Sequence, residues 1–182
     1  MREVVEAAGQ RNAAAVHYYF GSKDDLLREL LIDGADLIDA GRKRLFDEAE
    51  ASGTPCLRDV VRAMVLPNID LAGETGENET YFRFIVNVQN ERRALFRDTV
   101  PEHSESYRRY MAHVHRLLAP LPAATINQRL LFAGLSLQTL LAAREAAQDR
   151  SDTGDHHFWS RPEAVTGMLD AVQSILTSPA SG

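Results

Sequence analysis

The sequence is poor in cysteine and has no long apolar run. Its 182 residues include a single cysteine, which excludes an internal disulfide framework and fits a reducing compartment. The most apolar stretch, residues 130–143, is shorter than the roughly 18–20 residues that a membrane span needs, and it contains three polar side chains. Met1 is followed at once by Arg2 and Glu3, which is unlike a secretory signal. We therefore expect a cytoplasmic protein with no membrane partner.

Positive charge is also in deficit. Lysine and arginine number 20 against 26 aspartate and glutamate, for a net charge of −6. This balance argues against a protein that coats nucleic acid over its whole surface, but it leaves room for a local basic patch. Between Ala7 and Lys23 the charged residues are Arg11 and Lys23, with no acid between them. That segment is the candidate patch.

Motifs for catalysis and for metal binding are missing too. There is no Gly-x-Ser-x-Gly, no phosphate-cradling glycine loop and no His-Glu-x-x-His. His113 and His115 are two residues apart, which puts their side chains on different faces of a helix. Cys56 has no evident base partner and is interpreted as a packing residue. We expect no enzyme activity, no cofactor and no metal.

Apolar residues recur at three- and four-residue steps along nearly the whole chain, which predicts an all-α fold. Ser22-Lys23-Asp24-Asp25 is a Ser-x-x-Asp variant of the capping box, so a long helix is predicted to begin there and to end near Gly53. The next helix is predicted from Leu57 up to Pro67. Residues 72–80 and 151–157 are predicted to be loops.

Residues 81–88 have the local propensity of a strand. A lone strand would leave its backbone without a partner, so we predict a buried helix there instead. Three more helices are predicted, at residues 107–121, 123–148 and 165–176.

The first residues form a helix-turn-helix pattern. Residues 2–8 are predicted to be a short helix that Gly9 stops, and Gln10-Arg11-Asn12 makes the turn. Asn12 can cap the next helix, which starts with three slim alanines. In this arrangement a second helix enters a DNA major groove about 12 Å wide.

This segment resembles the tetracycline-repressor (TetR) family of bacterial regulators. The matching residues are Ala8-Gly9, the run Ala15-Val16-His17-Tyr18-Tyr19-Phe20, and the following Gly21-Ser22-Lys23-Asp24-Asp25-Leu26-Leu27. The motif-level match runs from Arg2 to about Leu31, and beyond it the likeness is one of architecture. The turn is one residue longer than the commonest family spacing, and His17 stands where a tyrosine is usual.

The resemblance implies a ligand-responsive transcriptional regulator, typically a repressor that a small molecule releases from double-stranded operator DNA. Residues 1–22 would be part of the DNA-binding region, and residues 23–182 a helical domain for effector binding and homodimerisation. It also implies that a first helix and the start of the second precede Arg2. Without them Val4, Val5, Val16 and Phe20 lack their cover, so we expect weak DNA binding by these 182 residues.

The resemblance and the side-chain chemistry together predict the DNA contacts. Arginine pairs with guanine and asparagine with adenine in the major groove, whereas tyrosine, histidine and lysine donate to phosphates. Base edges would be met by Arg11, Asn12, Ala13 and Ala14, and phosphates by His17, Tyr18, Tyr19 and Lys23. One of the two tyrosines can be a core ring instead, but not both, because they are adjacent on a helix.

A ligand pocket is predicted on the middle helices, where methionines lie beside aromatic side chains and suit an apolar small molecule. Its residues would be Met64, Phe82, Phe84, Ile85, Val88, Met111 and His115. Taken singly, each of them is more typical of an ordinary core residue than of a pocket.

Residues 130–143 carry apolar side chains on more than one face, which indicates burial on two sides. We predict a dimer interface made with the last helix by Leu130, Ala133, Leu137, Leu141, Val165, Met168, Leu169 and Val172. The alternative is a central helix within one chain's larger core. The alternative function is a helical dimerisation or ligand-binding module that no longer binds DNA.

Overall fold

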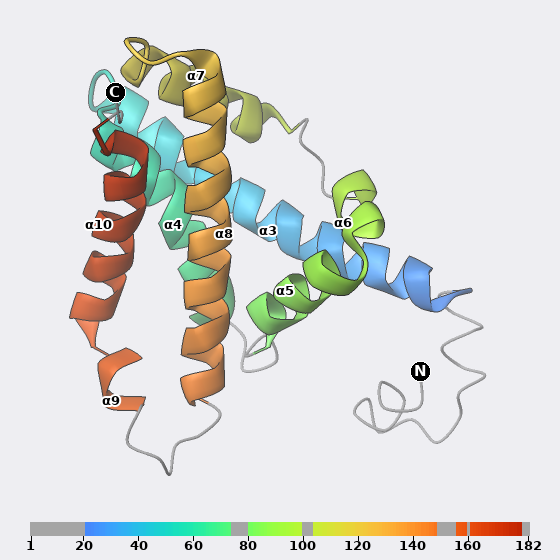
Figure 1. The fold of residues 1–182 in the computed structure, drawn as a ribbon. Helices are drawn as coiled ribbons and strands as arrows, with labels where there is room; N and C mark the ends of the chain where they lie inside the picture. Colours follow the sequence, from blue (N-terminus) through green and yellow to red (C-terminus); the bar gives the residue numbers. More distant parts are fainter. Residues whose placement is uncertain (1–20, 74–79, 100–103, 149–155, 160, 180–182) are drawn as a thin grey trace.

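The computed structural model describes residues 21–73, 80–99, 104–148, 156–159 and 161–179 (Figure 1). Within these ranges the regular structure is entirely helical, which confirms the all-α prediction. The predicted helix-turn-helix of residues 2–20 lies outside the described residues.

The longest helix, α3, runs from Lys23 to Ala51 and begins at the predicted cap. The backbone N–H of Asp25 donates to Ser22 Oγ over 3.1 Å, and that hydroxyl donates to the Asp25 carboxylate over 2.5 Å. The capping box read from the sequence is therefore confirmed, and it fixes the residue at which α3 begins.

The second helix, α4 (Leu57–Gly73), continues past Pro67, where we expected it to end. Proline removes one helix hydrogen bond, but Pro67 is buried and Leu71 beyond it belongs to the core. The Asn68 amide donates to the Met64 carbonyl over 2.6 Å beside this irregularity. Burial of Pro67 and Leu71 outweighs the local helix breaker.

The remaining helices follow in order. They are α5 (Tyr81–Glu91), α6 (Arg93–Thr99), α7 (Glu105–Leu117), α8 (Ala123–Gln148), α9 (His156–Trp159) and α10 (Pro162–Thr177). The helix predicted at residues 81–88 and the long helix over 123–148 are confirmed. We did not predict α6, and α9 begins within the segment predicted to be a loop.

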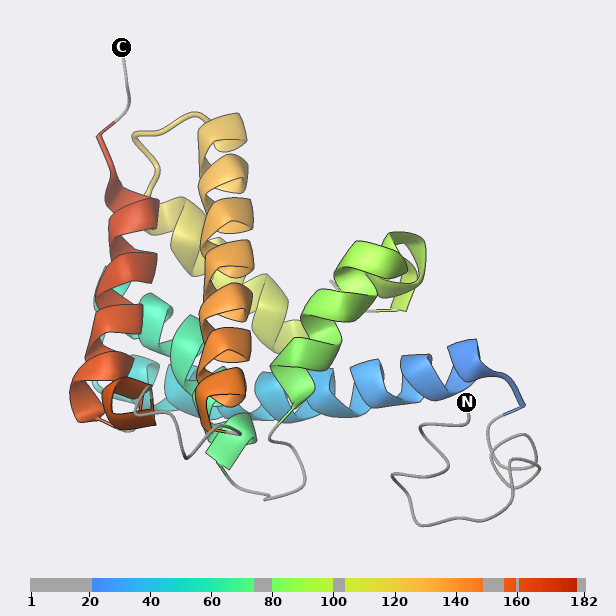
Figure 2. The ribbon, with the colours of Figure 1, turned by 60° about the horizontal axis from the view of Figure 1, so that its bottom comes forward.

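Buried side chains form two clusters. The main core joins the second half of α3 to α4, α7, α8 and α10, and Phe46, Val60, Val114 and Val172 in it are completely buried. The smaller one, here called the α5–α6 cluster, contains Leu31, Ile85, Val88 and Leu95. In Figures 1 and 2, α8 and α10 stand side by side, while α5 and α6 lie over the first half of α3.

Two glycines on α3 allow its neighbours to come close. A Cβ at Gly34 would lie 2.1 Å from the Tyr81 ring of α5, and one at Gly41 would lie 2.9 Å from Cβ of Pro67 on α4. The two glycines are seven residues apart and so lie on one face of the helix. Because Gly34 and Gly41 have no side chains, α5 and α4 can both pack closely on α3, and α3 contributes to both clusters.

Candidate functional site

A cavity of about 310 Å³ lies between the middle helices, where the two clusters meet. Helices α3, α4, α6, α7 and α8 all contribute to its lining, together with Ser104 just before α7. Its polar residues include Asp39, Arg42, Asn68 and Gln138. A cavity of this size is at the small end of the range for ligand pockets.

Asp39 organises one side of the cavity. Its Oδ1 accepts hydrogen bonds from the hydroxyls of Ser104, over 2.5 Å, and of Ser106. Nη1 of Arg42, one turn along α3, is 3.4 Å from the same oxygen. Ser104 is also the N-cap of α7, since its Oγ accepts from the Tyr107 backbone N–H over 3.1 Å. The carboxylate thus joins α3 to the start of α7.

Arg42 is the positively charged residue that pairs with Asp39 in the cavity lining. Its side chain is 16% exposed, and its guanidinium carbon lies 5.7 Å from the centroid of the Tyr110 ring. Burial lowers the pKa of Arg42, and the neighbouring Asp39 opposes that shift. Burial also raises the pKa of the Tyr110 phenol, so the ring stays neutral beneath the cation.

Polar atoms around the cavity are left without partners. Nε of Arg42 and Oε1 of Gln138 are buried and have no hydrogen-bond partner among the described residues. A buried polar atom that makes no hydrogen bond costs about 1–3 kcal/mol. Arg42 and Gln138 both line the cavity, so an ordered water or a bound molecule is a candidate partner for these atoms.

None of the residues predicted for the ligand pocket lines this cavity. Met64, Phe82 and Met111 belong to the main core or pack against it, whereas Phe84, Ile85 and Val88 belong to the α5–α6 cluster. His115 is exposed on α7. The predicted set shares only α4 and α7 with the cavity lining, and four of its residues are on α5, which contributes nothing to that lining. Apart from His115 it consists of core-packed side chains, because apolar patterns identify buried faces and say nothing of gaps between them. The polar lining residues have no such pattern.

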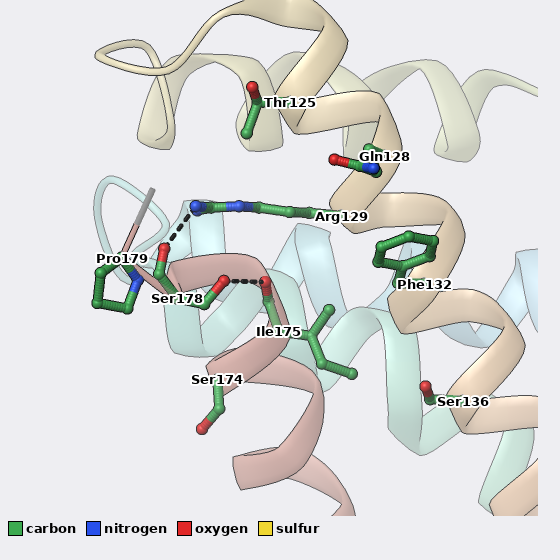
Figure 3. Close-up of a pocket in the computed structure, with 9 residues that line it drawn as sticks. All are labelled: Thr125, Gln128, Arg129, Phe132, Ser136, Ser174, Ile175, Ser178 and Pro179. Carbon is green, nitrogen blue, oxygen red and sulfur yellow. Dashed lines mark hydrogen bonds between the residues drawn. The ribbon is translucent and has the colours of Figure 1, made fainter. Parts of the chain in front are cut away.

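A second feature is an open groove of about 810 Å³ between α8 and α10 (Figure 3). Phe132 and Ser136 of α8 face Ser174 and Ile175 of α10 across it. At one end Arg129 donates to the carbonyls of Leu176 and Ser178, over 2.8 and 2.5 Å, and so caps the end of α10.

The exposed apolar face of α8 differs from the predicted one. Ala133, Leu137, Leu141, Met168, Leu169 and Val172 are buried in the chain's own main core, and Leu130 and Val165 pack against it. The six buried side chains cannot contact a partner from there, and Leu130 and Val165 are half-buried, so this choice of interface residues is corrected. Instead Leu131, Phe132 and Leu135 are 58%, 50% and 46% exposed. The sequence predicts two apolar stripes, but only packing decides which one faces inward.

One predicted DNA-contact residue is described. Lys23 is exposed and is the first residue of α3, beside Asp24 and Asp25. The others, Arg11, Asn12, Ala13, Ala14, His17, Tyr18 and Tyr19, lie outside the described residues.

A network of charged groups joins α3 to α7 on the surface. Arg109 donates to both oxygens of Glu50, over 2.9 and 2.6 Å, and to Asp47 over 2.7 Å. Nε2 of His113 is 2.9 Å from Glu50, and its ring stacks on Phe46. The hydrogen bonds from Arg109 and then from His113 lower the pKa of Glu50 to about 2. His113 therefore has a structural partner in a carboxylate.

Three other sequence interpretations can be compared with the described ranges. Cys56 is exposed, so its interpretation as a packing residue is wrong. In the described part of the chain, no group of three or more His, Cys, Asp or Glu side chains is arranged to hold a metal ion. None of the described helices is both long enough and apolar enough to cross a membrane.

Comparison with known proteins adds no relative: no protein-family model, no curated protein and no solved structure matches the chain.

Proposed function

We propose that the protein is a homodimeric, ligand-responsive transcriptional regulator of the TetR type, and that it acts on double-stranded operator DNA in the cytoplasm. One observation carries the proposal. Helix α3 begins at Lys23, the last residue of the Tyr18-x-Phe20-Gly21-Ser22-Lys23 string, and the same helix lines the cavity with Asp39 and Arg42. A single rigid element thus connects the proposed DNA reader with the proposed effector site.

The proposed mechanism is a population shift. An effector in the cavity favours one position of α3 relative to α7 and α8, which contribute Tyr107 and Gln138 to the same lining. In a dimer this changes the spacing of the two reading heads, which must match half-sites about 34 Å apart. A small-molecule effector would then release a repressor from its operator.

The second copy in this proposal covers the exposed face of α8 and the groove beside α10. A face with three large apolar side chains about half exposed is typical of an interaction site. Self-pairing of one face about a twofold axis is the commonest way to cover it. The remaining part of the proposal, DNA contact, depends on the segment before α3.

DNA binding is tested by selection from a random duplex library at low salt, where phosphate contacts are strongest and weak binding is still captured. We expect enrichment of a sequence with twofold symmetry. Lys23→Ala should weaken binding uniformly and reduce the salt slope by about one, because Lys23 contacts a phosphate in this proposal. The control is Lys43→Ala, whose amine pairs with Asp47 away from the start of α3.

Assembly is tested by sedimentation equilibrium. We expect a dimer, and Phe132→Glu should convert it to a monomer because a buried unpaired charge is costly at an interface. Leu37→Glu is the matched control, since Leu37 is 56% exposed on α3 and does not line the groove between α8 and α10. A wild-type monomer at all concentrations would contradict the dimer.

One observation favours the alternative of a helical module that does not bind DNA. The first turn of α3 carries Asp24 and Asp25 beside Lys23, and these carboxylates would repel phosphates. Selection that enriches no sequence at low salt, from a protein that is dimeric, would support this alternative over the regulator.

A further inference from the structure

We infer that the cavity between the middle helices binds a small, uncharged polar molecule that has an amide- or hydroxyl-type end and a ring or short alkyl body. The inference names the chemical class of the effector, so it rests on the proposed function. It also replaces the apolar ligand expected from the sequence.

The first argument comes from the charges already present. Arg42 and Asp39 are one turn apart and pair with each other, and Asp39 also accepts two hydroxyl hydrogen bonds. Asp36, the other charged residue in the lining, is exposed to solvent and is not part of this pair. A carboxylate ligand would compete with Asp39 for Arg42, and an ammonium ligand would compete with Arg42 for Asp39. Either would leave one partly buried charge without its partner, and that is costly. A neutral ligand leaves the pair intact.

The second argument comes from the polar groups that are not paired. Oε1 of Gln138 and Nε of Arg42 are buried and make no hydrogen bond to the described residues. The Asn68 amide donates to Met64, which leaves its carbonyl oxygen able to accept. A terminal amide can exchange its oxygen and nitrogen by rotation, so Gln138 offers either a donor or an acceptor. These groups fit a ligand that itself has both, as an amide or an alcohol does.

The third argument comes from the rest of the lining. Ile38, Phe96 and Tyr107 supply apolar and aromatic surface on α3, α6 and α7. The volume of about 310 Å³ suits a molecule of roughly one substituted ring. A wholly apolar ligand would fill this space but would leave the Gln138 and Arg42 atoms unpaired, so it would gain no affinity from them.

The test is a matched series on a benzene ring: benzamide, benzoate, benzylammonium and toluene. Each is titrated into the full 182-residue protein, and binding is followed by NMR through the side-chain amide signals of Asn68 and Gln138. We expect benzamide to bind most tightly and to shift both signals. A tighter fit for benzoate, benzylammonium or toluene would overturn the assignment, as would a failure of all four to bind.

Gln138→Leu is the informative variant. It keeps the side-chain volume and removes an unpaired polar group, so the variant should fold and its Tm should not fall. Benzamide affinity should drop about tenfold or more, because a hydrogen bond is lost, whereas toluene should bind no worse. Gln89→Leu, on α5 and outside the cavity lining, is the control and should change neither affinity. Equal benzamide binding by Gln138→Leu and the wild type would overturn the role given to Gln138.

The experiments distinguish failure of the ligand class from failure of the proposed function. Benzamide-type binding together with failed DNA selection would keep the ligand class and remove the regulator. Successful DNA selection with no binding of any of the four compounds would keep the regulator and overturn the ligand class.

Discussion

The main core and the α5–α6 cluster are held together in different ways. The main core closes on itself from several helices, and large side chains such as Phe46, Ile126 and Leu176 have almost no exposure. The α5–α6 cluster has four buried residues, and Leu95 among them is on the short helix α6. Since the stabilisation from burial grows with the apolar area removed from water, the smaller cluster has much less of it.

Polar contacts support the smaller cluster. The buried Glu145 of α8 accepts from the backbone N–H groups of Phe82 and Arg83, over 2.8 and 2.9 Å, and so caps the start of α5 from another helix. At the other end, Arg92 pairs with Asp24 at the start of α3 over 2.7 Å. These hydrogen bonds and this ion pair require a stricter geometry than the burial of apolar side chains does. Phe82 at the start of α5 belongs to the main core, so the comparison indicates that α6, the later turns of α5 and the first half of α3 can open while the main core persists.

The cavity lies between the main core and the α5–α6 cluster. Phe96 of α6 forms part of its wall, and the other walls come from helices of the main core. A bound molecule would therefore contact both regions at once. This is the arrangement in which a small ligand can shift the equilibrium between two packings.

The largest expected effect comes from truncating one buried apolar side chain in each of the two regions. Phe46→Ala should lower the free energy of unfolding by about 3–5 kcal/mol, because it opens a cavity in a closed core. Leu95→Ala should cost about 2–3 kcal/mol, since the partly exposed edge can collapse onto the gap. Urea unfolding measures both, and hydrogen exchange should show faster opening confined to α5 and α6 for the second variant only. Equal, global effects would remove the distinction between the two regions.

Glu145→Gln tests the polar support directly. The variant keeps the shape but replaces a charged acceptor of two N–H groups, and we expect a loss of about 1–3 kcal/mol. Hydrogen exchange at Phe82 and Arg83 should accelerate more than exchange in α10. Glu163→Gln, at an exposed position in the first turn of α10, is the control and should change little. No change in exchange at α5 would show that this cap does not support the cluster.

The Glu50 network belongs to the main core's surface and should respond to pH. The folded-state pKa of Glu50 is lowered from 4.5 to about 2. A lowered carboxyl pKa means that its stabilising contribution is present above pH 4.5 and is lost as pH falls toward 2. Because the carboxylate is 38% exposed, we expect less than about 1 kcal/mol after screening by solvent. Urea unfolding across this window should show a shallower pH dependence for Glu50→Gln. Parallel curves would contradict the assignment.

The smallest effect concerns the Arg92–Asp24 pair. Both side chains are about 42–43% exposed, so breaking the pair should cost no more than about 0.5 kcal/mol. A double-mutant cycle with Arg92→Ala and Asp24→Ala measures the coupling, and 0.5 M salt should reduce it. A coupling well above 1 kcal/mol would mean that the α5–α6 region is fastened more firmly than its small cluster indicates.

Much of the secondary structure was predictable because its signals are local. The Ser22 cap and the long apolar periodicity of α8 act within a few residues of the backbone they order. The continuation of α4 past Pro67 was missed because its cause is tertiary: Pro67 packs against Gly41 of another helix. The short helix α6 was missed because a single buried residue, Leu95, makes no periodic pattern.

The candidate site was harder to predict for the same reason. Asp39, Asn68 and Gln138 are polar residues scattered over 100 positions of sequence, and no spacing relates them. Their common cavity exists only because α3, α4 and α8 meet there. In the same way, the sequence showed that α8 has apolar side chains all round, but not which of them the chain would cover itself.

The sequence by itself therefore determined the helical class of the described protein, the start of α3 and the extent of α8, because capping and periodicity are properties of neighbouring residues. Tertiary structure alone decided which stripe of α8 is exposed, where the cavity lies and which polar atoms remain unpaired within the described ranges. Those outcomes depend on how distant helices share a limited apolar surface, and no local pattern encodes that division.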